Sequence, residues 1–315
     1  MKIDKYLDSF SEYLFVQNYS SRTIESYTSS VKAFFRFIEK HYNRIKSIEM
    51  ITVEILSDYR SYLSNYHTPR GSILTSSTQL NILLGLKCFF KYMNENDYIP
   101  INPLKDIRLP RREDGIIRNI LSEDEVKKVL DSLTTNTPLQ IRNRAIIELL
   151  YSCGIRTTEL CNLKTSEIDL KEQTITIVKG KGKKTRMVPI GQYATEYLRL
   201  YLEKSRRFLL RGKKQDPGNV FLSNTGNPFE KCSLNSSVIA PIMKNAKIGK
   251  HISAYSFRHS IATHLLENKV DIMYIARLLG HKSLNTTQRY TRVEISDLKR
   301  VHSLTHPRER FDDKI

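Results

Sequence analysis

The chain has 315 residues and a formal net charge of +18, with 51 Lys and Arg side chains against 33 Asp and Glu. This length accommodates two domains, each with a core of its own, and the charge indicates a polyanionic partner. The apolar runs fall far short of the roughly 20 residues that span a bilayer, so no membrane segment is expected. Four cysteines without paired metal-ligand spacing, and an N-terminus unlike a signal peptide, predict a protein of the reducing cytoplasm.

The positive charge is unevenly distributed along the chain. Residues 1–108 carry 14 basic and 11 acidic side chains, whereas the remainder carries 37 and 22. Most of the excess therefore belongs to the second part of the chain, and binding of a nucleic-acid backbone by such a surface would depend steeply on salt.

Apolar residues recur at helical spacing through the first hundred residues, and no alternating strand pattern interrupts them. They predict a small helical bundle, with Gly85 and the cluster 94–97 as punctuation. The aromatic residues fall on one face of each helix, so we interpret them as core and not as platforms for stacking bases. The predicted helices cover residues 3–14, 21–40, 52–64 and 76–94.

A stretch rich in Pro, Gly and charge follows and predicts a linker. Helices resume at Ser122 with the pattern of a capping box. Alternation over 174–178 and 187–190, around a Gly-rich turn, predicts a β-hairpin. The fold class is therefore mainly α (α+β): a helical bundle plus a mixed, mostly helical second domain with a small β-sheet. The predicted boundaries are 1–108 for the helical domain, 109–118 for the linker, 119–302 for the second domain and 303–315 for a C-terminal tail.

Two arginines are placed where helices begin. Arg156 follows a Gly turn, with Glu159 three residues later, and Arg258 lies near the start of another helix. Helix N-termini favour anions, and the planar guanidinium matches phosphate oxygens. A structural pair between Arg156 and Glu159 is the alternative. His259, next to Arg258, is interpreted as a structural histidine.

Further basic and polar residues accompany these arginines. Lys181 lies in a Gly-rich basic turn between the two predicted strands, where a purely solvated loop is the alternative. His281 follows Gly280, which ends a predicted helix, and Tyr290 comes nine residues later. Breaking and rejoining a phosphodiester without losing its bond energy requires a protein nucleophile that stores the phosphate covalently, together with cationic donors, and this chain supplies both.

The ordered motifs closely resemble those of the tyrosine recombinases, the Xer-type and simple integrase members above all, over essentially the whole chain. The resemblance implies a core-binding first domain and a catalytic second domain. It implies that Tyr290 attacks the scissile phosphate, and that Arg156 and Arg258 clamp its nonbridging oxygens. The remaining roles that it implies are leaving-group protonation by Lys181, a hydrogen bond to the phosphate from His281, and orientation of neighbouring groups by Glu159. No cofactor and no metal are expected.

Tyr255 departs from the family pattern, which usually has His at the first position of the His-x-x-Arg motif. A phenol with a pKa near 10 can hold a phosphate but is a poor base at neutral pH. We therefore expect Tyr255 to donate a hydrogen bond and cleavage to be slower than in relatives that carry His there.

The resemblance further implies double-stranded DNA with short inverted core sites as substrate, a homotetramer on synapsed DNA and a Holliday junction intermediate, with a paralogous recombinase as a further conceivable partner. The chain begins at its core-binding domain, which favours a simple recombinase without an arm-binding domain. The departure at Tyr255 favours a mobile-element or specialised enzyme over a housekeeping one. Integration and excision, inversion and dimer resolution all stay open. The apolar face of Val293–His302 is expected to dock on a neighbouring subunit, and the tail from Thr305 to dock elsewhere or stay mobile. Two alternatives are a catalytically weak or inactive DNA-binding protein and a type IB topoisomerase-like enzyme.

Overall fold

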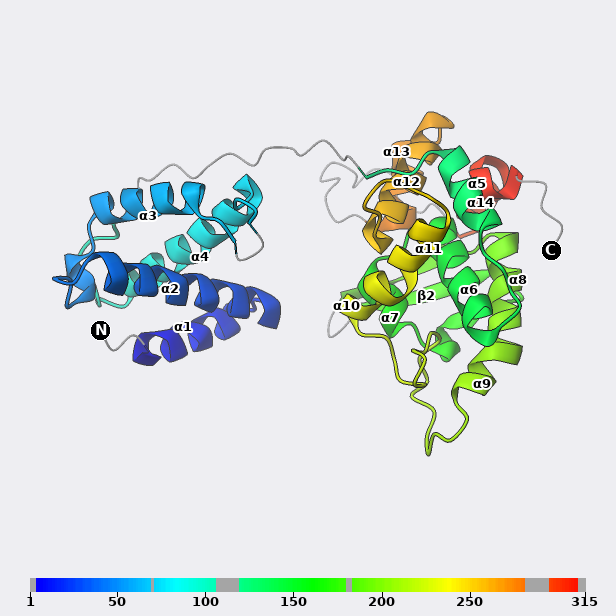
Figure 1. The fold of residues 1–315 in the computed structure, drawn as a ribbon, viewed down its shortest axis with the longest axis horizontal. Helices are drawn as coiled ribbons and strands as arrows, with labels where there is room; N and C mark the ends of the chain where they lie inside the picture. The colour runs from blue at the N-terminus through cyan, green and yellow to red at the C-terminus, as the bar shows by residue number, and fades with distance from the viewer. Residues whose placement is uncertain (1–3, 69–70, 106–118, 180–182, 281–294, 311–315) are drawn as a thin grey trace. The chain divides into compact units, whose positions relative to one another are not determined.

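The computed structural model describes residues 4–68, 71–105, 119–179, 183–280 and 295–310. The chain divides into two compact units, Met1–Ile116 and Ile117–Ile315. Their architecture is mainly helical with one small sheet, as the sequence predicts. The colour ramp of Figure 1 separates the blue and cyan helices of the first unit from those of the second.

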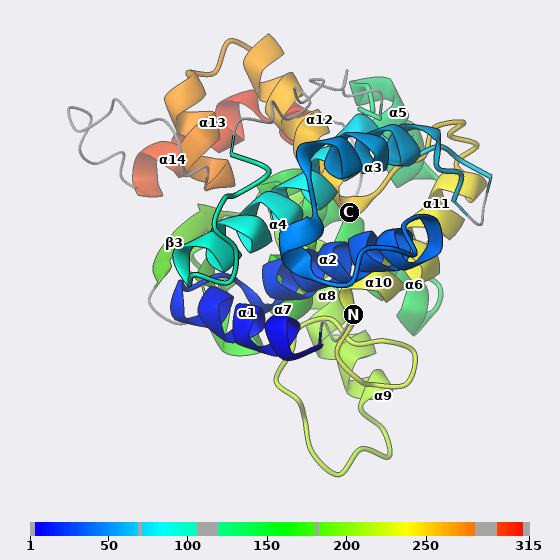
Figure 2. The same cartoon turned by 90° about the vertical axis from the view of Figure 1, so that its left-hand side faces the viewer.

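The first unit is a bundle in which α2 packs along α4, and α1 lies against both (Figure 2). Fully buried aromatic rings fill its centre, among them Phe10, Phe34, Phe89 and Phe90, so their interpretation as core is confirmed. Edge-to-face contacts such as Phe34 with Phe90, at 6.0 Å between ring centroids, add to the area that they bury. The four α-helices that the structure describes here are α1 (Asp4–Val16), α2 (Ser21–His41), α3 (Val53–Asn65) and α4 (Ser76–Glu95), with a 3-10 turn at Ile48–Met50.

Gly85 does not punctuate the bundle. It lies buried inside α4, and a Cβ there would come within 3.2 Å of Tyr27 and Ser30 on α2. Glycine is used here because the two helices approach each other closely, although it costs roughly 1 kcal/mol in helix propensity relative to Ala.

The second unit is built around α6 (Pro138–Cys153), which is buried along most of its length and packs against α8 (Gln192–Leu200) and α12 (Ala254–Glu267) (Figure 1). Both α5 and α6 begin with a capping box, the first at Ser122 as predicted. The other helices described in this unit are α5 (Glu123–Asp131), α7 (Thr157–Asn162), α9 (Arg207–Leu209), α10 (Lys231–Leu234), α11 (Ala240–Asn245), α13 (Ile272–Leu279) and α14 (Ile295–Thr305), with π-helical turns at Tyr201–Arg206 and Asn235–Ile239 and 3-10 turns at Thr165–Glu167 and Pro307–Arg310.

The predicted hairpin is present as strands β2 (Thr174–Lys179) and β3 (Lys183–Pro189), which pair antiparallel with Ile177 opposite Arg186. A short strand that the sequence did not reveal, β1 (Ile168–Asp169), pairs with β2 and completes a sheet in the order β1-β2-β3. Two residues are too few for a periodicity to be recognised.

The C-terminal segment docks within its own chain, so the prediction that it docks elsewhere or stays mobile is wrong for residues 306–309. Helix α14 packs against β3, and Leu298 is buried, which gives the apolar face a place in the same unit. Beyond α14, His306 and Arg308 are almost fully buried. The Arg308 guanidinium donates to both carboxylate oxygens of Glu148 on α6, each at 2.9 Å. The sequence of a charged tail does not reveal a buried ion pair, because the partner residue lies far away along the chain.

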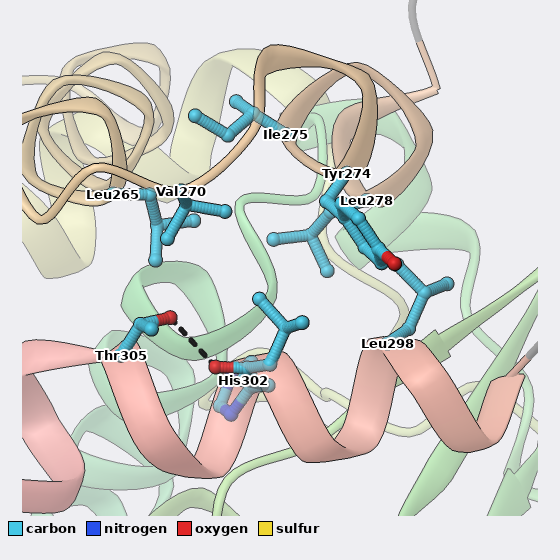
Figure 3. A pocket seen from close by; sticks show the side chains of 9 residues that line it. Leu265, Val270, Tyr274, Ile275, Leu278, Leu298, His302 and Thr305 are labelled. Carbon is cyan, nitrogen blue, oxygen red and sulfur yellow. Dashed lines mark hydrogen bonds between the residues drawn. The ribbon is translucent and has the colours of Figure 1, made fainter. Parts of the chain in front are cut away.

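The seam along α14 leaves only a small crevice, about 20 Å³ in volume (Figure 3). Leu265, Val270, Leu278 and Leu298 line it with carbon atoms, which characterises it as a packing seam. Among the residues that the structure describes, no helix combines the length and the apolarity needed to cross a bilayer.

Candidate active site

The turn between α6 and α7 positions Arg156. Helix α6 ends at Gly154, whose left-handed conformation (φ 56°) suits glycine, and a Cβ there would lie 2.5 Å from Leu279. The chain then enters α7 with Arg156 as its N-cap. The side chain of Arg156 is 39% exposed, so its guanidinium reaches the surface while its backbone is fixed.

Arg258 lies one turn inside α12 and is buried, with 4% of its surface exposed. Its guanidinium donates to the carbonyl of Gly154 and to that of Leu279, each at 2.6 Å. Burial, followed by the charge of Arg156, lowers the pKa of Arg258 to about 10, so it stays charged at neutral pH. Two of the five guanidinium protons are used in these bonds, and others are left for a ligand.

Gly280 links the two arginines. It ends α13 in a left-handed conformation (φ 66°), as expected from the sequence. Its carbonyl accepts a hydrogen bond from Arg156 at 3.2 Å, and the preceding carbonyl, of Leu279, accepts from Arg258. Motifs more than 100 residues apart in sequence are thereby brought together at the residue that precedes His281.

Glu159 provides the carboxylate of this cluster. Its oxygens accept from the backbone N–H and the guanidinium of Arg156, both at 2.9 Å, so the structural pair between them is present. They also accept two bonds from Arg186, both at 2.8 Å. Burial by itself raises the pKa of Glu159, but the bonds from Arg186 and Arg156 lower it to about 2.

Arg186 also belongs to the described part of the site, although no sequence motif marks it. In the sequence it lies close to the basic turn that carries Lys181. A signal was available, because Arg186 lies two residues before the buried Val188 along β3 and therefore shares the inward face of the strand.

Tyr255 lies one turn before Arg258 on α12 and is 61% exposed. Its ring packs edge-on against His259, with centroids 4.3 Å apart. His264, on the same helix, is buried and pairs with the hydroxyl of Tyr151 at 2.9 Å.

The described part of the site combines three guanidiniums with one carboxylate, which is a surplus of positive charge suited to an anion. No group of His, Cys, Asp and Glu able to hold a metal ion occurs among the described residues. Three residues expected at the site lie outside the described residues: Lys181, His281 and Tyr290.

Comparison with protein families gives two matches. Residues 119–296 match the phage integrase family, and residues 6–99 match the phage integrase N-terminal SAM-like domain.

Curated relatives match over nearly the full length. The chain is 36% identical to the tyrosine recombinase XerC of Bacillus licheniformis over 307 residues, covering 97% of each chain. It is 30% identical to the XerC of Bacillus subtilis, again covering 97% of each.

Solved structures agree with this assignment. The structure of the XerH site-specific recombinase bound to palindromic difH substrate, in its post-cleavage complex, superposes with a TM-score of 0.68 at 25% identity, covering 92% of this chain and 78% of that one. A lambda integrase (75–356) dimer bound to a COC′ core site shares the fold, with a TM-score of 0.67 at 19% identity, covering 100% and 99%. The chain therefore belongs to the phage integrase family, as a tyrosine-type site-specific recombinase.

Proposed function

We propose that this recombinase cleaves and rejoins double-stranded DNA at short inverted core sites through a covalent bond to Tyr290. The observation that carries this is the convergence of Arg156 and Arg258 at the carbonyls of Leu279 and Gly280. The chain that leaves this point leads directly to His281 and, nine residues on, to Tyr290.

The reaction is an exchange of phosphate esters. The Tyr290 hydroxyl gives up its proton to solvent as its oxygen attacks the scissile phosphorus, the bond to the 5′-oxygen breaks, and a 3′-phosphotyrosyl link and a free 5′-hydroxyl result. Lys181 gives the leaving 5′-oxygen its proton as general acid. Attack of a 5′-hydroxyl on the phosphotyrosine reverses these steps, so the bond energy is conserved and no ATP is needed.

The arginines stabilise the charge that develops on the nonbridging oxygens, with His281 and Tyr255 as further hydrogen-bond donors. Arg258 is suited to this role because its guanidinium is already immobilised by two carbonyls and needs no reorganisation. Glu159 holds the backbone and side chain of Arg156 at the start of α7.

For the assembly we propose a homotetramer on two synapsed sites, with a Holliday junction between two rounds of strand exchange. Structural relatives support this: a lambda integrase of the same fold was solved as a tetramer bound to a Holliday junction. Integration and excision, inversion or dimer resolution are the outcomes open to such a complex.

The test is a covalent trap on denaturing gels. Wild-type protein, Tyr290→Phe and Tyr255→Phe are incubated with nicked duplexes tiled from the DNA that flanks the reading frame of this chain. We expect an adduct with wild type and with Tyr255→Phe, and none with Tyr290→Phe. An adduct that survives in Tyr290→Phe but disappears in Tyr255→Phe would show that Tyr255, and not Tyr290, is the nucleophile. Retarded DNA that is never linked to the wild-type protein would contradict the proposed chemistry and favour an inactive DNA-binding protein.

A further inference from the structure

Arg186 lies on β3, between the start of α7 and the end of α13. From β3 its guanidinium reaches Glu159 on α7 with two parallel hydrogen bonds of 2.8 Å. On its other side it lies against Gly280, where a Cβ would come within 2.9 Å of the guanidinium carbon. Its side chain is 12% exposed, compared with 39% for that of Arg156.

Two guanidiniums therefore share one carboxylate. Arg186 occupies one hydrogen-bonding position on each oxygen of Glu159, and the Arg156 guanidinium meets only one of these oxygens. Without Arg186, the carboxylate would be free to hold Arg156 with both oxygens in the planar, two-pronged geometry that arginine favours with carboxylates. The positive charge that a phosphate would meet would also fall by one.

The hydrogen bonding of Arg186 is incomplete. Its Nε is buried and has no hydrogen-bond partner among the described residues. An unpaired buried donor is destabilising, so stability alone is a weak reason for an arginine here. Among the described residues, the two side-chain hydrogen bonds of Arg186 both go to Glu159, the carboxylate that Arg156 also contacts.

We infer that Arg186 is a positioning residue that occupies the Glu159 carboxylate and thereby keeps the Arg156 guanidinium available for the scissile phosphate. This inference rests on the function proposed above. Arg186 itself does not touch the phosphate; it acts through the balance of charge and hydrogen bonds at Glu159.

The experiment measures single-turnover adduct formation on the duplex identified by the covalent trap, at a temperature where melting curves show every variant folded. Arg186→Gln should slow adduct formation by about tenfold to 10²-fold, the range that a misplaced catalytic group can cost. The double variant Glu159→Gln, Arg186→Gln removes the uncompensated carboxylate and should recover much of this loss. Arg186→Lys keeps a charge beside Glu159 and should lose less than Arg186→Gln, which provides a second variant should the glutamine variant not fold.

A readout specific to Arg156 uses a duplex with a methylphosphonate at the scissile position. This group lacks the nonbridging charge that Arg156 would stabilise, so wild type and Arg186→Gln should differ little on it. The matched control is Arg206→Gln, since Arg206 also makes a two-pronged pair, with Asp216 at 2.7 and 2.5 Å, but belongs to the packing of another loop. We expect this control to lower the melting temperature and leave the rate per folded molecule unchanged.

Three results would overturn the inference. Wild-type rates in Arg186→Gln would show that Arg186 has no influence on the site. A double variant no faster than Arg186→Gln, or an equal loss on phosphate and methylphosphonate, would indicate that Arg186 only anchors the hairpin. In all three cases the proposed function stands, whereas an absent wild-type adduct would remove that function and the inference with it.

Discussion

Arg258 is charged, buried and bonded to two backbone carbonyls, so its side chain is tightly constrained. Its guanidinium connects the turn before Arg156 to the end of α13, so it has a structural role as well as the catalytic role that we propose. A lysine in its place could donate to both carbonyls, but its ammonium group lacks the planar geometry that fits phosphate oxygens.

Arg258→Lys should therefore lower the rate of adduct formation by about 10²- to 10³-fold, the loss typical for a donor that stabilises transition-state charge. The rate is measured by denaturing gel under single-turnover conditions. Arg277→Lys is the control, because Arg277 is exposed on α13, and it should cleave like wild type. Comparable rates for the two variants would contradict a role of Arg258 at the phosphate.

Tyr255 offers a test in the opposite direction. The ring is largely exposed and packs only edge-on against His259, so a smaller imidazole can replace it without leaving a cavity. Tyr255→His should leave adduct formation equal to wild type or faster, because an imidazole can both hold the phosphate and accept a proton near neutral pH. An inactive Tyr255→His variant would show that the phenol has a specific function in this chain.

At the scale of elements, the site is assembled from helix ends. Helix α6 ends at Gly154 and α13 at Gly280, both left-handed, and Arg258 on α12 donates to the carbonyls at these two ends. The last carbonyls of a helix have no partner within it. Here buried and half-buried guanidiniums serve as those partners, which fixes the helix ends and the arginines together.

Gly280→Ala should disturb this assembly more than strain alone would. Gly212 provides the control, since it is also left-handed (φ 79°) but has open space around its would-be Cβ. We expect Gly212→Ala to lower the free energy of unfolding by about 1–2 kcal/mol from the left-handed backbone. Gly280→Ala should cost roughly 1–3 kcal/mol more, because its methyl group would collide with the Arg186 guanidinium, which two hydrogen bonds to Glu159 hold in place. Denaturant unfolding measures both, and equal losses would argue against the close contact.

At the scale of the whole molecule, the end of the chain completes the core of the second unit. Glu148 is fully buried between Arg144 and Arg308, each 2.9 Å from its Oε1. Arg308 in turn lies over the ring of Tyr193, 3.8 Å from its centroid. Residues 306–309 therefore cannot be removed without exposing or unbalancing a buried charge.

Arg308→Gln should lower the free energy of unfolding by about 3–5 kcal/mol, the cost of breaking a buried ion pair by removing one partner. Arg300→Gln is the control, because Arg300 is exposed and its ion pair with the exposed Asp297 is long, at 4.0 Å. Its effect should stay below about 1 kcal/mol. Thermal unfolding followed by circular dichroism measures both, and a small loss in Arg308→Gln would show that the segment is dispensable.

Two buried histidines, one on α14 and one just after it, make stability depend on pH. His302 and His306 are buried and stacked, 4.4 Å between ring centroids, and each Nε2 donates to a carbonyl of α6, that of Ser152 and of Tyr151 respectively. Burial lowers the pKa of His302 to about 4 and that of His306 well below its usual value, with His302 and Arg308 nearby as further causes for the latter.

Both histidines are thus neutral in the folded protein and take up protons on unfolding. Their contribution is fully present above a pH of about 6.5 and is lost as the pH falls toward 4, by about 3 kcal/mol for His302 alone. The melting temperature should therefore drop over this window, and less so in His302→Gln. A wild-type melting temperature that is constant from pH 7 to 5 would contradict this.

Much of the fold was accessible from the sequence because it is encoded locally. The capping box at Ser122, the hairpin around the Gly-rich turn and the helix end at Gly280 each depend on a few neighbouring residues. The prediction that Gly85 interrupts the helical region was wrong, because glycine occurs both where a helix ends and where two helices approach closely. Only the position of the neighbouring helix distinguishes the two cases.

The sequence by itself determined the fold class and the family, and the order of the residues that we propose to be chemically active, since periodicity and motif spacing are properties of the chain. Only the tertiary structure decided how Arg156, Arg258, Glu159 and Arg186 share hydrogen bonds, and that Arg308 closes the core. The physical reason is that a charged side chain can be buried only where distant segments supply its partners, and no local pattern records which segments those are.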